Sequence, residues 1–203
     1  MSSLIKKITA PNGGVFTGGG TNTYLVGKED ITVVDPGPYI QSHLDKIIEA
    51  GNNNIKRIIV THTHKDHSPG AKPLAEILNV PVIGSFAKFD MSIQDETFKP
   101  DQILHDKDII NTSEYTIEVI HTPGHASNHF CFLIQEEECL LTGDHIMNGS
   151  TVVIAPPDGN MTEYLESLKK LDNFNIKLLA PGHGDYLHAV SYTHLRAHET
   201  TSD

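Results

Sequence analysis

The chain has 203 residues, which favours one domain over two, and its 38% apolar and 20% charged residues exclude a disordered protein. No apolar run approaches the ~20 residues of a membrane span, and the first residues lack the apolar run of a signal peptide. We therefore expect a cytoplasmic protein with no membrane partner. The net charge of -11 argues against an extended surface for nucleic acid.

Short β-rich runs and amphipathic segments alternate through the first half of the chain. Strands are predicted at residues 21–26, 31–34, 55–60 and 80–83. Helices are predicted at residues 41–50 and 70–78, where apolar side chains recur at helical spacing. Ser42 is placed to cap the first helix and Gly51 to end it. Residues 84–108 are ambiguous and carry no predicted element.

The second half is richer in strands. They are predicted at residues 115–120, 129–134, 139–141 and 176–179, and one helix is predicted at residues 161–171. Asn160 and Glu163 have the spacing of a capping box at the start of that helix. Grouped strands with helices between and after them predict a layered α/β domain with sheets in the middle and helices outside. Cys131 and Cys139 are expected to be free thiols in or near strands.

A dense group of metal-binding residue types follows the strand predicted at 55–60. His62 and His64 are two residues apart in an extended segment, so their side chains point the same way and can hold one ion. Asp66 and His67 lie past a bend and can turn toward a second ion. Uncoordinated histidines at this density would repel one another when protonated, so the pattern predicts a metal site.

Three further candidates each follow a predicted strand. His125 comes after a Pro-Gly turn, Asp144 follows a glycine, and His183 lies between two glycines. Each signal is weak alone, but together they complete two sites. We expect His62, His64 and His125 to hold one ion, Asp66, His67 and His183 to hold the other, and Asp144 to bridge them.

Three protein ligands with an open position are typical of catalytic zinc rather than structural zinc. Nitrogen and oxygen donors suit zinc, iron or manganese, with zinc the default, so we expect two divalent metal ions as cofactors.

These segments, in this order, resemble the metallo-β-lactamase superfamily. The matching motifs are THTHKDH, TPGH, TGDH and PGHG, together with an early Val-Asp-Pro-Gly at residues 34–37. The resemblance implies an αββα four-layer sandwich with the site at one edge of the paired sheets. Residues 20–25, 35–38, 121–129, 143–146 and 149–153 look most like the lactamase-β-like protein 2 group. Some members of that group cut single-stranded RNA, and members usually continue past PGHG into a small C-terminal region.

The resemblance and the ligand set together predict a binuclear-metal hydrolase that uses a metal-bound hydroxide. Single-stranded RNA is the substrate that the group implies. A thioester or ester hydrolase of the glyoxalase II type shares the same seven ligands and stays open as an alternative. Two further alternatives are an iron-dependent dioxygenase and a binding module on an inactive site. Nothing in the sequence indicates an oligomeric state.

Several residues near the ligands carry role predictions. Asp66 is expected to orient the nucleophile as well as bind metal. His129 and His145 are candidates to contact substrate or to protonate a leaving group, with a hydrogen-bonded structural role as the alternative. Asp35 is either the hydrogen-bond partner of a ligand imidazole or a turn residue. His43, His105 and His188 are expected at the surface.

The last stretch of the chain resembles the translated end of a DNA adapter used in preparing sequencing libraries. We therefore expect residues 1–189 to be a C-terminally truncated metallo-β-lactamase-fold domain and residues 190–203 to be a non-native tail. Amplification of the gene from its source should give a sequence that departs from this one after residue 189. A natural gene that still encodes residues 190–200 would contradict the hypothesis.

Overall fold

Two six-stranded sheets form the centre of the protein, in a computed structural model that describes residues 4–89 and 92–188. The predicted tail, residues 190–203, lies outside the described residues. The first sheet contains, in spatial order, β1 (Ile5–Thr9), β2 (Asn22–Val26), β3 (Ile31–Val34), β4 (Ile55–Ile59), β5 (Val82–Gly84) and β6 (Gln102–Ile103). The second contains β12 (Leu187–His188), β11 (Leu178–Pro181), β10 (Cys139–Gly143), β9 (Phe130–Ile134), β8 (Thr116–His121) and β7 (Ile109–Asn111).

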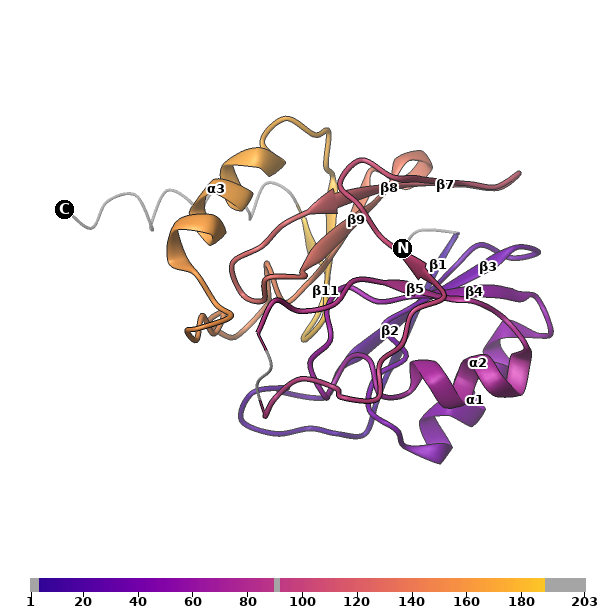
Figure 1. Ribbon diagram of the computed structural model, residues 1–203. Helices are drawn as coiled ribbons and strands as arrows, with labels where there is room; N and C mark the ends of the chain where they lie inside the picture. The colour runs from indigo at the N-terminus through magenta and orange to yellow at the C-terminus, as the bar shows by residue number, and fades with distance from the viewer. Residues whose placement is uncertain (1–3, 90–91, 189–203) are drawn as a thin grey trace.

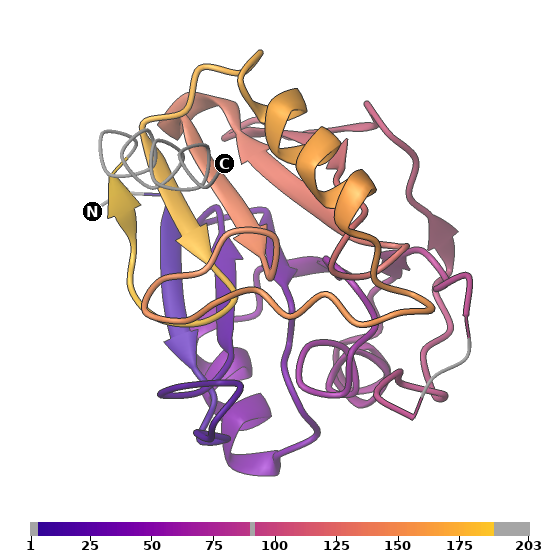
Figure 2. The ribbon, with the colours of Figure 1, turned by 90° about the vertical axis from the view of Figure 1, so that its left-hand side faces the viewer.

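Helices cover the outer face of each sheet. α1 (Gln41–Gly51) and α2 (Ala71–Leu78) lie against the first sheet, and α3 (Met161–Leu171) lies against the second (Figure 1). A view turned by 90° shows α3 running alongside the neighbouring strands of the second sheet (Figure 2). A short 3-10 turn, η1 (Gln135–Glu137), joins β9 to β10. This arrangement is the αββα sandwich that the motifs predicted.

Three apolar clusters fill the spaces between the layers. The largest lies between the two sheets and includes Val34, Ile117 and Phe132. A second lies between the first sheet and its helices, and a third lies between the second sheet and α3. Because the central strands are covered on both faces, every residue of β2, β3, β9 and β10 is buried. That explains why β9 is a continuous apolar run in the sequence and why the other three strands show no strict alternation of apolar and polar residues.

The predicted strands and helices are all present, with ends shifted by a few residues. The expected capping of α1 is wrong: Ile40 is the N-cap residue without a side-chain hydrogen bond, and Asn52, in the left-handed conformation, ends the helix after Gly51. The unassigned region supplies β6, which pairs with β5 in parallel. Both cysteines are free and buried, as expected. No helix in the described ranges is long and apolar enough to cross a membrane.

The sequence predicted His43 at the surface, and this prediction is wrong. Its side chain is on the buried face of α1, and its Nε2 atom lies 2.8 Å from the hydroxyl of Thr23. Burial lowers the pKa of His43 to about 4, so the ring stays neutral. The error arose because one polar residue on an amphipathic helix was assigned to the solvent face. His105 and His188 are exposed, as expected.

The N-terminus of α3 allows a direct test of the helix signal. The side chain of Asn160 accepts hydrogen bonds from the amides of Thr162 and Glu163, while its own amide donates to Gly124 O instead of closing a capping box. Replacing Asn160 with Ala should lower the free energy of unfolding by about 1 kcal/mol, because two amides lose their acceptor. Urea denaturation measures the loss. Asn160→Asp keeps an acceptor and should remain close to wild type; equal losses in both variants would contradict the capping role.

Candidate metal centre

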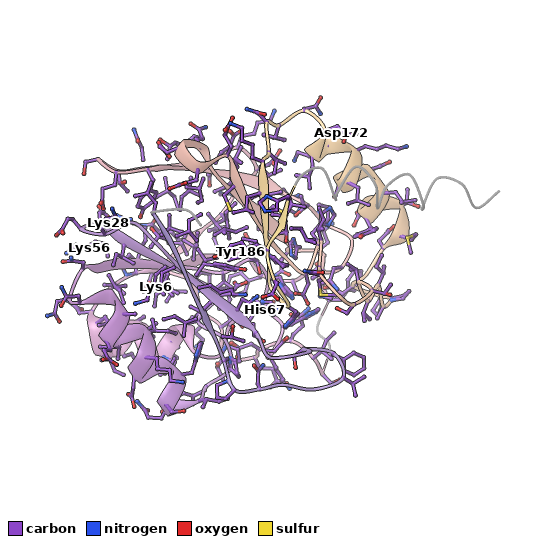
Figure 3. All side chains as sticks on the ribbon, turned by 180° about the vertical axis from the view of Figure 1, so that it is seen from behind. Lys6, Lys28, Lys56, His67, Asp172 and Tyr186 are labelled. Carbon is purple, nitrogen blue, oxygen red and sulfur yellow. The ribbon has the colours of Figure 1, made fainter. Side chains whose placement is uncertain are left out.

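Loops at one edge of the sandwich bring all seven predicted ligands together. The loop after β4 supplies four of them, the loop after β8 supplies His125, the end of β10 is followed by Asp144, and the end of β11 is followed by His183. Figure 3 labels His67 among the side chains where loops of the two sheets meet. The ligands form two groups, one of His62, His64 and His125, and one of Asp66, His67, Asp144 and His183.

The first group consists of three imidazoles with converging nitrogen atoms. His64 Nδ1 lies 3.0 Å from His62 Nε2 and 2.9 Å from His125 Nε2. All three side chains are buried. Burial and the neighbouring histidines lower the pKa of His62 well below its ordinary value, and burial and His125 lower that of His64 to about 3. His62 and His64 are therefore neutral, and the three rings place nitrogen atoms around a shared point where a divalent ion can bind.

The second group combines two imidazoles with two carboxylates. His183 Nε2 lies 3.2 Å from Asp66 Oδ2 and 3.4 Å from Asp144 Oδ1. Burial opposes protonation of His183, but the neighbouring carboxylates of Asp144 and Asp66 outweigh it and raise its pKa to about 9. The pKa of His67 is also raised, because the same two carboxylates outweigh its burial. The carboxylates thus favour positive charge at this point, whether from protons or from a metal ion.

Asp144 connects the two groups. Its Oδ1 lies 3.3 Å from His67 Nε2 in the second group, and its Oδ2 lies 3.6 Å from His125 Nε2 in the first. His67 Nε2 and Asp144 Oδ1 are buried, yet neither has a hydrogen-bond partner among the described residues. Unpartnered buried polar atoms that face each other are unfavourable unless something binds between them. The residues therefore fit two metal ions, with Asp144 placed to bridge them.

Asp35 holds this edge of the site in place. It is buried at a positive φ of 51°, and its Oδ1 accepts a hydrogen bond from the amide of Thr61 at 2.7 Å. Its Oδ2 accepts from the Thr61 hydroxyl at 2.7 Å and lies 2.9 Å from His67 Nδ1. Of its two predicted roles, hydrogen-bond partner of an imidazole is therefore confirmed, and that imidazole belongs to the predicted ligand His67. Thr61 in turn contacts His62 Nδ1 at 3.0 Å, so one carboxylate orients two ligands.

Backbone carbonyl groups hold two other ligands. His125 Nδ1 lies 2.5 Å from Val153 O, and His183 Nδ1 lies 3.2 Å from Gly20 O. An N–H donated from Nδ1 leaves the Nε2 lone pair free for metal. Sequence reasoning missed both contacts, because a carbonyl group gives no side-chain signal. The close packing of His183 and Asp144 also depends on Gly182, because a Cβ at this position would lie 2.6 Å from Asp144 Oδ1.

The two other catalytic candidates lie behind the ligands. His129 is fully buried, with Nδ1 2.9 Å from the Thr122 hydroxyl, and its Nε2 accepts from the amide of Asp144 at 3.2 Å. His145 is also fully buried, and its ring packs against Tyr164 at a centroid distance of 4.9 Å. Neither ring reaches solvent. The geometry therefore favours positioning of Asp144 by His129 over contact with substrate, and it gives His145 no substrate-facing atom.

Asp66 is the ligand with the most open side chain. Its exposed fraction is 29%, against 10% or less for Asp144, His125 and the other ion-paired ligands. A hollow of about 660 Å³ is lined by Thr63, which lies between His62 and His64 in the sequence, and by the aromatic residues Phe86, Phe89 and Phe98. None of the seven ligands lines this hollow. Among the ion-paired ligands, Asp66 is therefore the one that is most accessible from solvent.

Comparison with known proteins agrees with this geometry. The sequence profile of the metallo-beta-lactamase superfamily matches residues 16–183, which contain all seven ligands. The chain belongs to the metallo-beta-lactamase superfamily. A metallo-beta-lactamase family protein from Thermus thermophilus superposes with a TM-score of 0.79 at 20% identity, over 97% of this chain and 79% of that one. At that identity the superposition supports the fold alone.

Two curated relatives illustrate the range of the superfamily around this chain. A beta-lactamase-like protein 2 homolog from Caenorhabditis elegans is 33% identical over 94% of this chain and 64% of its own length. An atrochrysone carboxyl ACP thioesterase from Cryptosporiopsis sp. is 27% identical over 91% of this chain and 55% of its own length. The chain thus spans between about half and two thirds of these relatives.

Asp35 provides a test of how the ligands are held. All three groups that it binds are donors, so Asp35→Asn would turn an amide donor toward at least one of them. We expect zinc affinity to fall about 10- to 100-fold, the range found when partners of metal ligands are changed. Competition with a zinc chelator measures it. Asp45→Asn, which makes the same charge change at an exposed site on α1, should bind zinc as wild type does; a matching loss there would contradict the positioning role.

Proposed function

We propose that the protein is a binuclear metal hydrolase that acts on a thioester or ester. The observation that carries the proposal is the pair of ligand groups joined by Asp144, with Asp66 as the partly exposed member. Three imidazoles suit zinc at the first position, and two imidazoles with carboxylates suit zinc, iron or manganese at the second. The superfamily match supports a hydrolase with metal at these residues.

Two divalent ions held here would lower the pKa of water and polarise the oxygen that gains charge during hydrolysis. The residues of the chain supply the rest. Asp66, the partly exposed carboxylate, would accept a hydrogen bond from the attacking water and orient it. Asp144 keeps the two ligand groups at a fixed separation, and Asp35 keeps His67 in the tautomer that presents Nε2. Hydrolysis of a thioester adds water across the C–S bond and releases an acid and a thiol.

Three observations favour a thioester or ester over nucleic acid. The net charge of -11 repels a polyanion. The hollow at Thr63 is lined largely by apolar surface, which suits an apolar group more than a phosphodiester chain. One of the relatives is a thioesterase by name. An acyl thioester with an apolar acyl group is therefore the substrate class that we propose first.

Single-stranded RNA remains the second candidate. It is favoured by the 33% identity with the beta-lactamase-like protein 2 homolog, together with the motifs that resemble that group. A hydrolase for RNA would use the same seven ligands, so the ligands do not separate the two substrates. The net charge of -11 favours the thioester or ester over RNA, and we place RNA second for that reason.

Metal removal and replacement test the proposal. Protein purified without chelator should contain close to two zinc ions per chain, and His64→Ala should lose at least one, because the first group then has two imidazoles. Elemental analysis measures both. Zinc-loaded protein should hydrolyse a panel of acyl thioesters and esters, and chelator-treated protein should not.

The controls separate the alternatives. Glu49→Gln on the exposed surface of α1 should retain both ions and the hydrolase activity. Cleavage of single-stranded RNA without thioester hydrolysis would make RNA the first candidate substrate and contradict the thioester proposal. One iron per chain with no hydrolysis would favour a dioxygenase, and absence of metal from wild type would contradict the proposal.

A further inference from the structure

A buried polar side chain outside the ligand set connects the loops that carry the first ligand group. Gln94 is 5% exposed and belongs to the region between β5 and β6 for which the sequence predicted no element. It lies opposite His64 in an isolated antiparallel bridge. The amide of Lys65 donates to Ile93 O at 2.9 Å, and the amide of Asp95 donates to Thr63 O at 2.7 Å. This short pairing fixes the backbone on both sides of His64.

The side chain of Gln94 extends the connection. Its Oε1 accepts a hydrogen bond from the hydroxyl of Thr63 at 2.6 Å, and its Nε2 donates to Asp158 Oδ2 at 3.1 Å. Asp158 Oδ2 also accepts from the amide of Ser127 at 3.2 Å. Asn128 Nδ2 donates to the Thr63 hydroxyl at 2.9 Å. We call Thr63, Gln94, Ser127, Asn128 and Asp158 the Gln94 cluster.

The donors and acceptors of the Gln94 cluster run in one direction. The Thr63 hydroxyl accepts from Asn128 and donates to Gln94, and Gln94 donates to Asp158. The amide of Gln94 has a separate acceptor and donor, so Oε1 accepts from the Thr63 hydroxyl while Nε2 donates to the Asp158 carboxylate. All five side chains are at least nine-tenths buried, so a lost contact would leave a buried polar atom without a partner.

Each ligand of the first group is close in sequence to a member of the cluster or to a segment that it holds. Thr63 lies between His62 and His64, and Ser127 and Asn128 follow His125. Asp158 lies on the same loop as Val153, whose carbonyl group contacts His125 Nδ1. The second ligand group is held by different contacts, those of Asp35 and of Gly20 O. Asp35 also reaches His62 of the first group through Thr61, whereas the hydrogen bonds of the Gln94 side chain go to Thr63 and Asp158, outside the second group.

We propose that Gln94 is a positioning residue for the first metal ion, acting through Thr63 and Asp158 without touching the ion. The inference rests on the proposed metal centre. It assigns a role to the segment between β5 and β6: this segment sets the spacing of His62, His64 and His125. Because the second ligand group has its own supports, loss of the Gln94 contacts affects the first ion selectively.

Gln94→Leu keeps the approximate size of the side chain and removes both hydrogen bonds. Zinc binding to purified protein is followed by competition with a chelator, and thermal unfolding is measured with and without zinc. We expect affinity for one of the two ions to fall about 10- to 100-fold while the other is retained. The rise in melting temperature on adding zinc should shrink accordingly, because binding to the folded state stabilises it by mass action.

Three further variants complete the test. Thr63→Val is nearly isosteric, removes the link between Gln94 and the ligand segment, and should weaken the same ion even if Gln94→Leu fails to fold. The double variant Gln94→Glu with Asp158→Asn keeps the net charge and rebuilds the contact between residues 94 and 158 with donor and acceptor reversed. The amide of Ser127 then faces an NH₂ group, so zinc affinity should be restored in part relative to Gln94→Leu. Ser85→Ala removes a hydrogen bond to Leu104 O from the same region and should bind zinc as wild type does.

The outcomes distinguish the inference from the proposed function. Wild type with two ions, and both Gln94→Leu and Thr63→Val with unchanged affinities, would overturn the positioning role and leave the hydrolase proposal intact. An equal fall in melting temperature with and without zinc would mean that Gln94 supports the fold only, which also overturns it. Wild type without zinc would overturn both.

Discussion

The convergence of nitrogen lone pairs in the first ligand group is the interaction on which the rest of the structure depends. His62 Nε2 and His125 Nε2 both lie within 3.0 Å of His64 Nδ1. Burial keeps His62 and His64 neutral, so each of these rings has a lone pair that it can offer to a cation at the common centre. Such an arrangement is unfavourable by itself and becomes favourable when a cation binds. The fold must therefore hold the imidazoles in place before the ion arrives.

The αββα sandwich does this with contacts that come from several layers. The first sheet supplies Asp35 and the loop after β4, and the second sheet supplies His125, Asp144 and His183. Tyr24 of the first sheet donates a hydrogen bond to Pro181 O at the end of β11, which ties the two sheets together beside the ligands. The clusters between the layers make this edge rigid, since close-packed interiors yield little to local strain.

Much of this centre could be predicted because its residue types are rare together. Three histidines and an aspartate in residues 62–67 give a signal that few other structures would produce, and strand ends placed the remaining ligands at the same edge. The strands themselves were visible as apolar runs. Asp35 could be proposed but not decided, because the same residue also fits a turn.

The parts that could not be predicted depend on contacts between segments distant in sequence. Gln94 pairs with Thr63 across 31 residues, and His183 meets Gly20 O across 163. No local sequence pattern around Gln94 or Gly20 predicts these contacts. His43 was misplaced for a different reason. It lies four residues before Ile47 on the buried face of α1, but it was assigned to the surface because it is polar, and its partner Thr23 is distant in sequence. Helix capping at Ser42 failed because the chain reaches α1 with Ile40 as its N-cap.

The most direct test of the metal centre is a crystal structure of zinc-loaded protein with anomalous diffraction measured on both sides of the zinc absorption edge. The account predicts two zinc peaks about 3.5–4 Å apart, one bound by His62, His64 and His125, and the other by Asp66, His67 and His183, with Asp144 between them. An absence of zinc peaks at these residues, or zinc bound only elsewhere on the molecule, would contradict it.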